Sequence, residues 1–169
     1  MEPATGSISV TVLNETSVDV DVERWAELVR RVLATEGVVG PAETNVVFVD
    51  RDAMAELNAE HMGAEGPTDV LSFPIDDDDD AGEENEWPPR FVGDIVVCGA
   101  VAAENAPAHA GSLDAELALL LVHGSLHLLG HDHAEADERA EMWAAEQRLL
   151  ADLWGPLPRD PWADGEVPS

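Results

Sequence analysis

The sequence predicts an α+β fold, in which a small mixed sheet of about four strands packs with about five helices around one buried helix. Short apolar runs typical of strands mix with segments that repeat apolar residues at helical spacing, and the connections are short. One helical segment, residues 113–129, is apolar almost all round, as expected of a helix buried on every side. The 169 residues, 45% of them apolar, suffice for one such core and therefore predict a single domain.

Four segments are predicted to be strands. Residues 8–12 alternate apolar and polar side chains, which indicates a half-buried strand, whereas the unbroken apolar run 46–49 is typical of a central one. Residues 69–73 precede Pro74, which cannot donate a ladder hydrogen bond and so marks a strand end or a sheet edge. The last strand covers residues 91–98. One of its faces is expected to carry Phe91, Gly93, Ile95 and Val97, and the other Asp94, as a structural or cleft-lining carboxylate.

Helical spacing predicts five helices, most of which begin after a capping side chain. Asp19 or Asp21 is placed to cap the first, and Ser112 to cap the apolar one. The expected extents are residues 21–35, from Asp50 or Asp52 to about Met62, 100–106, 113–129, and about 134–154.

Two segments are expected to lie outside the packed core. The five aspartates of residues 76–80, followed by glutamates up to Glu86, predict a solvated loop, with metal collection or gating as the less favoured alternative. The chain from Gly155 carries four prolines and predicts a disordered tail. The expected division is therefore a domain over residues 1–154 and a tail over 155–169.

The composition limits the classes of partner and compartment. The single cysteine, Cys98, excludes an intrachain disulfide. The chain start has no basic segment followed by an apolar run, so we expect a cytoplasmic protein. The longest strongly apolar run, residues 117–122, is far shorter than the about 20 residues of a membrane span, so no membrane partner is expected. The net charge of −28 opposes tight binding to nucleic acid by this chain alone.

The densest chemical signal is a run of four of the six histidines within residues 123–133. His123 and His127 are four apart, so on a helix they share one face with about 6 Å of rise between them. Gly130 is placed where a helix ends in a left-handed residue, after which the chain turns back and brings His133 towards the pair. Three neutral imidazoles are a ligand set that suits catalytic zinc. The sequence therefore predicts one Zn²⁺ per chain, held by these three histidines.

The choice of His133 over His131 rests on spacing. Metzincin proteases place their third histidine at the same distance from the first, with a glycine at the same intermediate position. Those proteases also need a glutamate directly after the first histidine as general base, and Gly124 stands there. The pattern therefore predicts a metal site that lacks the protease's base, and a metallopeptidase-like hydrolase stays as an alternative.

The same stretch closely resembles the histidine motif of the bacterial YbeY endoribonucleases, also called rRNA maturation factors. Residues 66–74 (Gly-Pro-Thr-Asp-Val-Leu-Ser-Phe-Pro) and 93–95 (Gly-Asp-Ile) match further segments in order and spacing. The resemblance covers the chain from about Ser7 to about Trp154. It implies a zinc-dependent hydrolase that cuts single-stranded RNA, matures the 3′ end of 16S rRNA and serves ribosome quality control. The implied partners are ribosomal RNA and the small ribosomal subunit or its assembly factors, and no DNA.

The resemblance also implies an assisting arginine just before the Pro-Thr-Asp block, and here Met62 occupies its place, after His61. His61, Arg51 or Arg90 are candidates to replace that cation. Zinc bound by three imidazoles lowers the pKa of its water to about 7, so the nucleophile is expected to be this water. No other catalytic residue is assigned. The loss of the arginine and the acidic charge keep a non-catalytic, zinc-stabilised ribosome-assembly factor as a second alternative.

Overall fold

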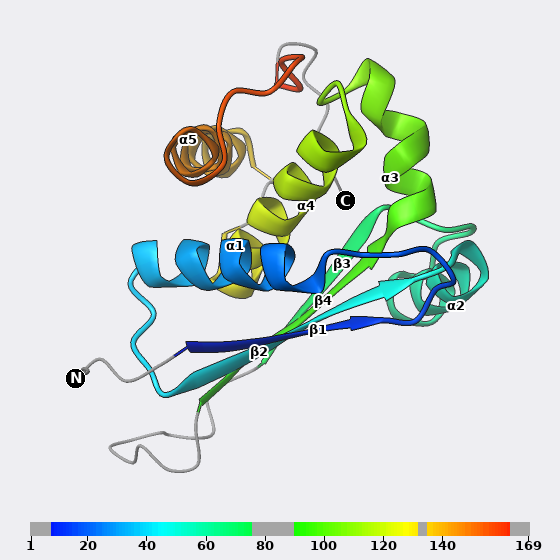
Figure 1. The fold of residues 1–169 in the computed structure, drawn as a ribbon, viewed down its shortest axis with the longest axis horizontal. Helices are drawn as coiled ribbons and strands as arrows, with labels where there is room; N and C mark the ends of the chain where they lie inside the picture. The colour runs from blue at the N-terminus through cyan, green and yellow to red at the C-terminus, as the bar shows by residue number, and fades with distance from the viewer. Residues whose placement is uncertain (1–7, 76–89, 132–134, 163–169) are drawn as a thin grey trace.

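The computed structural model describes residues 8–75, 90–131 and 135–162 (Figure 1), and it confirms the α+β prediction. Within these residues, five α-helices and one short 3₁₀ helix accompany a four-stranded sheet. In chain order, the elements are β1 (Ile8–Asn14), α1 (Val22–Thr35), β2 (Ala42–Val49), α2 (Arg51–Met62), β3 (Val70–Pro74), β4 (Arg90–Cys98), α3 (Gly99–Asn105), η1 (Ala106–Ala108), α4 (Leu113–Leu128) and α5 (Ala136–Leu153).

The sheet is mixed, with strand order β1-β2-β4-β3. β1, β2 and β4 run parallel to one another, whereas β3 pairs antiparallel with β4 and forms an edge that ends at Pro74, as predicted. The expected alternation along the last strand is wrong at its start. The register between β2 and β4 shifts between Glu43 and Thr44, and this irregularity places Val92 in the same core cluster as Ile95 and Val97.

Helices cover both faces of the sheet. α1 and α4 lie on one face and α5 packs outside them (Figure 1), burying a large cluster that includes Leu33, Ile95 and Leu120. On the other face, α2 buries Met54 against Leu71 and Val96. Thirteen of the sixteen residues of α4 are buried, as its apolar composition predicts, so α4 is the central helix of the domain.

The expected tail disorder is wrong for residues 155–162. Leu157 and Trp162 pack against the main core, and the backbone N–H of Arg159 donates to the carbonyl of Ala110 at 3.1 Å. The apolar side chains of the segment outweigh its prolines because they pack on the surface of the main core. Residues 163–169 and the acidic run 76–80 lie outside the described residues. Across the described ranges, none of the helices has the length and apolarity needed to cross a bilayer.

Candidate metal centre

Local sequence explains both ends of α4. The Ser112 side chain accepts from the backbone N–H of Ala115 at 3.2 Å and caps the first turn. At the other end, the N–H groups of Gly130 and His131 donate to the carbonyls of His127 and Leu126, at 3.1 and 3.0 Å. Gly130 has φ 100°, which completes a Schellman turn. The chain therefore reverses at Gly130, just after the end of α4, as the glycine position predicts.

His123 is 1% exposed and is held from α5. Its Nδ1 lies 2.6 Å from Oε2 of Glu146, which is itself fully buried. A carboxylate only accepts hydrogen bonds, so Nδ1 carries the proton. In the neutral form of the ring, this contact leaves the lone pair on Nε2.

The His127 ring is held in the same tautomer by a different contact. Its Nδ1 donates to the backbone carbonyl of His131 at 2.9 Å, across the Schellman turn. The rings of His123 and His127 have centroids 4.6 Å apart and planes at 85°. The i,i+4 spacing thus brings the two imidazoles together as predicted, each with its Nε2 lone pair set by an outer hydrogen bond.

This donor set fits a transition-metal ion. Metal-ligating histidines characteristically donate their other ring N–H to a carboxylate or a backbone carbonyl, which fixes the tautomer and the ring orientation. Both contacts are present here, one of each kind. Among the described residues no cluster of three or more ligand side chains forms, and His133 lies outside them. The assignment of the third ligand therefore stays a prediction.

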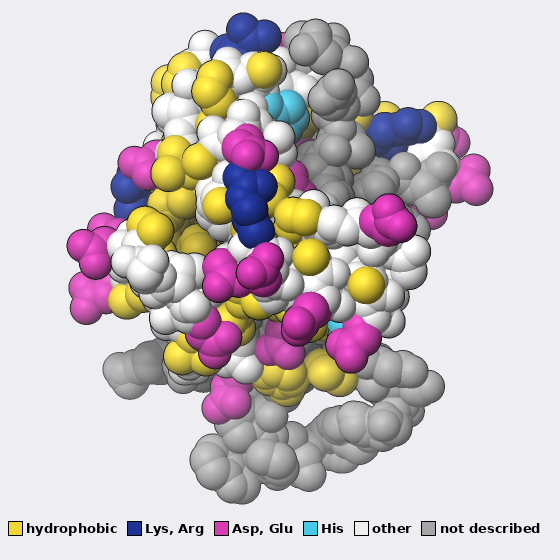
Figure 2. All heavy atoms as spheres, turned by 90° about the vertical axis from the view of Figure 1, so that its right-hand side faces the viewer, with side chains coloured by type: hydrophobic (Ala, Val, Ile, Leu, Met, Phe, Trp, Pro, Cys, Tyr) yellow, Lys and Arg dark blue, Asp and Glu magenta, His cyan; other side chains and the backbone are white. Residues whose placement is uncertain are grey.

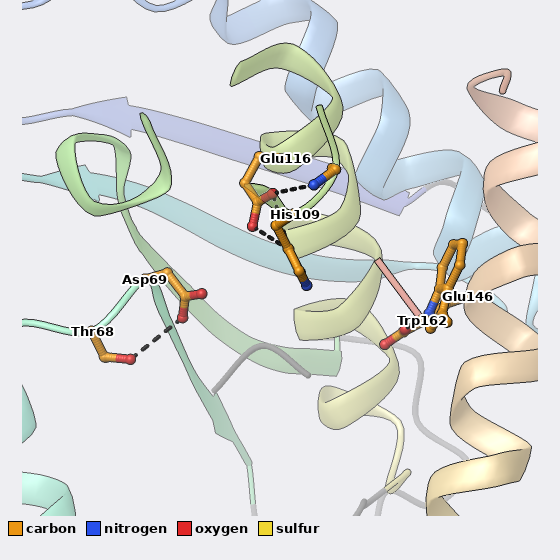
Figure 3. Close-up of polar contacts among 7 residues, drawn as sticks. Thr68, Asp69, His109, Glu116, Glu146 and Trp162 are labelled. Carbon is orange, nitrogen blue, oxygen red and sulfur yellow. Dashed lines mark hydrogen bonds and ion pairs between the residues drawn. The ribbon is translucent and has the colours of Figure 1, made fainter. Parts of the chain in front are cut away.

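The Glu146 carboxylate has a second donor, from the segment that follows α5. The indole Nε1–H of Trp162 donates to Oε1 of Glu146 at 2.9 Å, so each carboxylate oxygen has a partner. Figure 3 shows Glu146 on the side of α5 that faces α4, with Trp162 next to it. Sequence reasoning missed both residues. A signal for Glu146 was present, because it shares the buried stripe of α5 with Met142 and Leu149, where a carboxylate needs a partner.

Comparison with known proteins decides the family. The family described as Endoribonuclease YbeY matches residues 11–154. This chain belongs to the YbeY family. A Salinispora tropica relative named endoribonuclease YbeY is 47% identical over 149 residues, covering 85% of this chain and 95% of the relative. A Mycobacterium tuberculosis relative of the same name is 46% identical over 145 residues, covering 85% and 82%. The solution structure of a Thermotoga maritima protein matches with TM-score 0.59 and 29% identity, covering 86% of this chain and 89% of the other.

Gly124 has a packing role in this member of the YbeY family. The Ser72 hydroxyl on β3 donates to the Gly124 carbonyl at 3.2 Å, and a Cβ at Gly124 would lie 2.9 Å from Cγ2 of Ile95. α4 thus approaches the sheet too closely for a side chain at this position. Gly124 stands where metzincins have their general base, and residues of β3 and β4 occupy the space that a side chain there would need.

Met62, where the sequence resemblance leads one to expect an arginine, lies at the end of α2. Met62 is 62% exposed and precedes Gly63, which ends the helix in the left-handed conformation. The neighbouring His61 ring packs edge-on to Phe73 of β3, at 5.0 Å between centroids. β3 thus links the end of α2 to α4, because Phe73 contacts His61 and Ser72 bonds to Gly124.

Arginines elsewhere on the described chain are largely paired with acidic side chains. Arg51, a candidate replacement cation, is hydrogen-bonded to Glu104, and this bond raises the pKa of its guanidinium above the ordinary value. Three more ion pairs are Arg24–Asp114, Arg30–Glu27 and Arg148–Glu36. Figure 2 shows acidic side chains spread widely over the face that carries α2 and α3, with few basic ones. The side chain of Arg90, the other candidate cation, is not among the side chains that the structure describes.

Two other buried or half-buried carboxylates have structural partners. Glu116 of α4 contacts Nδ1 of His109 with both oxygens, at 2.8 and 3.0 Å, and accepts from the N–H of Ala110 (Figure 3). This contact joins the segment before α4 to its first turns. Asp94 accepts from the Asn45 amide at 3.1 Å, which favours the structural reading of that residue.

Proposed function

We propose that this member of the YbeY family is a zinc-dependent endoribonuclease that hydrolyses phosphodiester bonds in single-stranded RNA. Its proposed role is maturation of the 16S rRNA 3′ end and ribosome quality control, in the cytoplasm and together with the small ribosomal subunit or its assembly factors. Family membership supports the RNA-cleaving activity. The observation that carries the metal dependence is the pair of adjacent imidazoles whose Nδ1 groups both donate to fixed acceptors.

In this proposal His123, His127 and His133 hold one zinc ion. Bound zinc supplies a Lewis acid and lowers the pKa of water to about 7, which provides a nucleophile at neutral pH. The chain's own residues prepare the site. The Glu146 carboxylate and the His131 carbonyl keep the two described rings in the tautomer that ligates metal, and the buried setting of α4 keeps His123 from reorienting.

The packing of α4 argues against the metallopeptidase alternative. A glutamate at position 124 would collide with Ile95 and Ser72, so the site is built without the metzincin base. The alternative of a non-catalytic assembly factor is favoured only by the acidic charge and by Met62. RNA cleavage by the purified protein separates it from the proposal.

The test combines metal analysis with three substrates. The purified protein is analysed for metals and then incubated with labelled single-stranded RNA, double-stranded RNA and casein. We expect about one zinc per chain and cleavage of the single-stranded RNA alone, abolished by a chelator and restored by zinc. Casein hydrolysis would favour the peptidase, and zinc binding without RNA cleavage would favour the assembly factor.

His131→Ala should keep its zinc. The contact of residue 131 with the site runs through its backbone carbonyl, which alanine also provides. We expect zinc content and RNA cleavage within about twofold of the wild type, a difference of less than about 0.5 kcal/mol. Loss of zinc from this variant, with retention in His133→Ala, would show that His131 is the third ligand.

Met62→Arg should raise RNA cleavage. A guanidinium forms charge-assisted, often bidentate hydrogen bonds to phosphate, whereas a thioether offers dispersion and a weak acceptor. The exposed position of Met62 gives a longer side chain room. We expect an increase of about tenfold, equivalent to about 1.4 kcal/mol of barrier, in single-turnover cleavage of single-stranded RNA at fixed salt.

Met62→Gln is the matched control for the arginine variant, because it adds polarity without charge. Zinc content should be unchanged in both. Equal rates in the wild type and both variants would show that position 62 does not act on the scissile phosphate.

A further inference from the structure

The C-terminal segment reaches the outer side of the histidine pair. Residues 155–162 follow α5 and reach Ala110 just before α4, and the Trp162 indole lies next to the buried Glu146 carboxylate (Figure 3). From there, hydrogen bonds run from Trp162 Nε1 to Glu146 Oε1, 2.9 Å, and from His123 Nδ1 to Glu146 Oε2, 2.6 Å. The residues matched to the YbeY family end at 154, so Trp162 lies outside the matched region.

We propose that Glu146 and Trp162 are positioning residues of the metal centre, and that the segment 155–162 therefore supports metal binding. This inference rests on the proposed function, because it assigns the two residues to the same zinc site. Neither side chain is a ligand. Both carboxylate oxygens of Glu146 already accept from protein donors, so its role is exerted on the His123 ring.

Burial makes the two hydrogen bonds of Glu146 interdependent. A carboxylate that is removed from water is costly unless donors satisfy it, and Glu146 is fully buried. His123 provides one donor and Trp162 provides the other. If the indole N–H is removed, Oε1 keeps its desolvation cost without a partner, and the carboxylate is free to turn away from His123.

The charge of Glu146 also selects the tautomer of His123. A carboxylate requires the proton on Nδ1, which leaves the lone pair on Nε2 for a metal. A glutamine at position 146 has only one acceptor oxygen, whereas His123 and Trp162 each donate to a separate oxygen of the carboxylate. It leaves one of them unpaired, or its NH₂ group donates to Nδ1 and moves the ring proton to Nε2. Either result opposes ligation by His123 while the volume of the side chain is kept.

The test measures zinc affinity by competition with a chromogenic chelator, and separately measures denaturant unfolding of the metal-free protein. Trp162→Phe removes the N–H and keeps an aromatic ring. Trp154→Phe is the matched control, since the Trp154 ring stacks on Trp25 at 5.5 Å and lies under the Arg24 guanidinium. Glu146→Gln changes the carboxylate itself.

We expect zinc affinity to fall by about tenfold in Trp162→Phe and by more in Glu146→Gln, within the range of about 10–100-fold typical of outer-layer partners of metal ligands. Trp154→Phe should bind zinc like the wild type. The spectrum of the cobalt-substituted protein should also change in Glu146→Gln and not in the control, because the orientation of one ligand changes.

Two results would overturn the inference: wild-type affinity in both Trp162→Phe and Glu146→Gln, or an equal loss in Trp154→Phe, which would indicate general loosening of the domain. If Trp162→Phe is unfolded without metal, the zinc affinity and the cobalt spectrum of Glu146→Gln decide whether the inference holds. A wild-type protein that binds no zinc would instead refute the proposed function, so the two failures are distinguishable.

Discussion

His127→Ala should yield a folded protein with little bound zinc and with RNA cleavage reduced by about a hundredfold or more, equivalent to about 2.7 kcal/mol of barrier. The variant removes one of two adjacent imidazoles at the end of α4, together with its bond to the His131 carbonyl. His127 is only partly buried, so its loss leaves a smaller void than loss of a core residue would. Zinc is measured by elemental analysis after dialysis against a metal-free buffer.

His131→Ala is the control, because it removes a neighbouring imidazole and keeps the backbone carbonyl that orients His127. Circular dichroism of both variants checks that the helices are intact. Full zinc occupancy in His127→Ala would refute the assignment of this residue as a ligand. Zinc loss with unchanged RNA cleavage would separate the metal from the chemistry.

The elements and the histidine pair were predictable because their signals are local. The cap of α4 by Ser112, its end at a left-handed Gly130 and the i,i+4 pair of His123 and His127 each depend on residues within one or two turns. The edge position of β3 followed from Pro74 in the same way.

The support of the site was not predictable because its partners are distant in sequence. Glu146 lies 23 residues after His123, and Trp162 lies a further 16 residues on. The prolines of the tail indicated disorder, whereas the packing of Leu157 and Trp162 against the main core depends on a surface that exists only in the folded domain. The irregular register at Glu43 and Thr44 likewise depends on pairing between two strands, which no periodicity within one strand reveals.

The glycine of the Gly-Asp-Ile segment is another residue whose role only the fold reveals. Gly93 has φ 149° and lies where β4, β3 and the end of α4 meet. A Cβ there would lie 2.6 Å from the Phe73 carbonyl oxygen and 2.6 Å from Cδ2 of Leu128. Leu128 directly follows His127, so this close approach helps to set the position of the end of α4 that carries the histidine pair.

Gly93→Ala should therefore lower the free energy of unfolding by about 3 kcal/mol, which combines backbone strain at positive φ with overpacking of a filled core. The Phe73 oxygen belongs to the backbone of a paired strand and cannot turn aside as a side chain would. The measurement is denaturant unfolding with a chelator present, so that zinc binding does not add to the stability of either protein.

Gly99→Ala provides a matched control at the point where β4 ends and α3 begins. Gly99 begins α3, and a Cβ there meets nothing within 4 Å, so alanine should change the free energy of unfolding by less than about 1 kcal/mol. If Gly93→Ala lowers the free energy of unfolding no more than Gly99→Ala does, β3 and Leu128 can shift to accommodate a Cβ at position 93. The end of α4 would then be held mainly by Glu146 and the Schellman turn, and zinc affinity would be far more sensitive to Glu146→Gln than to any change at Gly93.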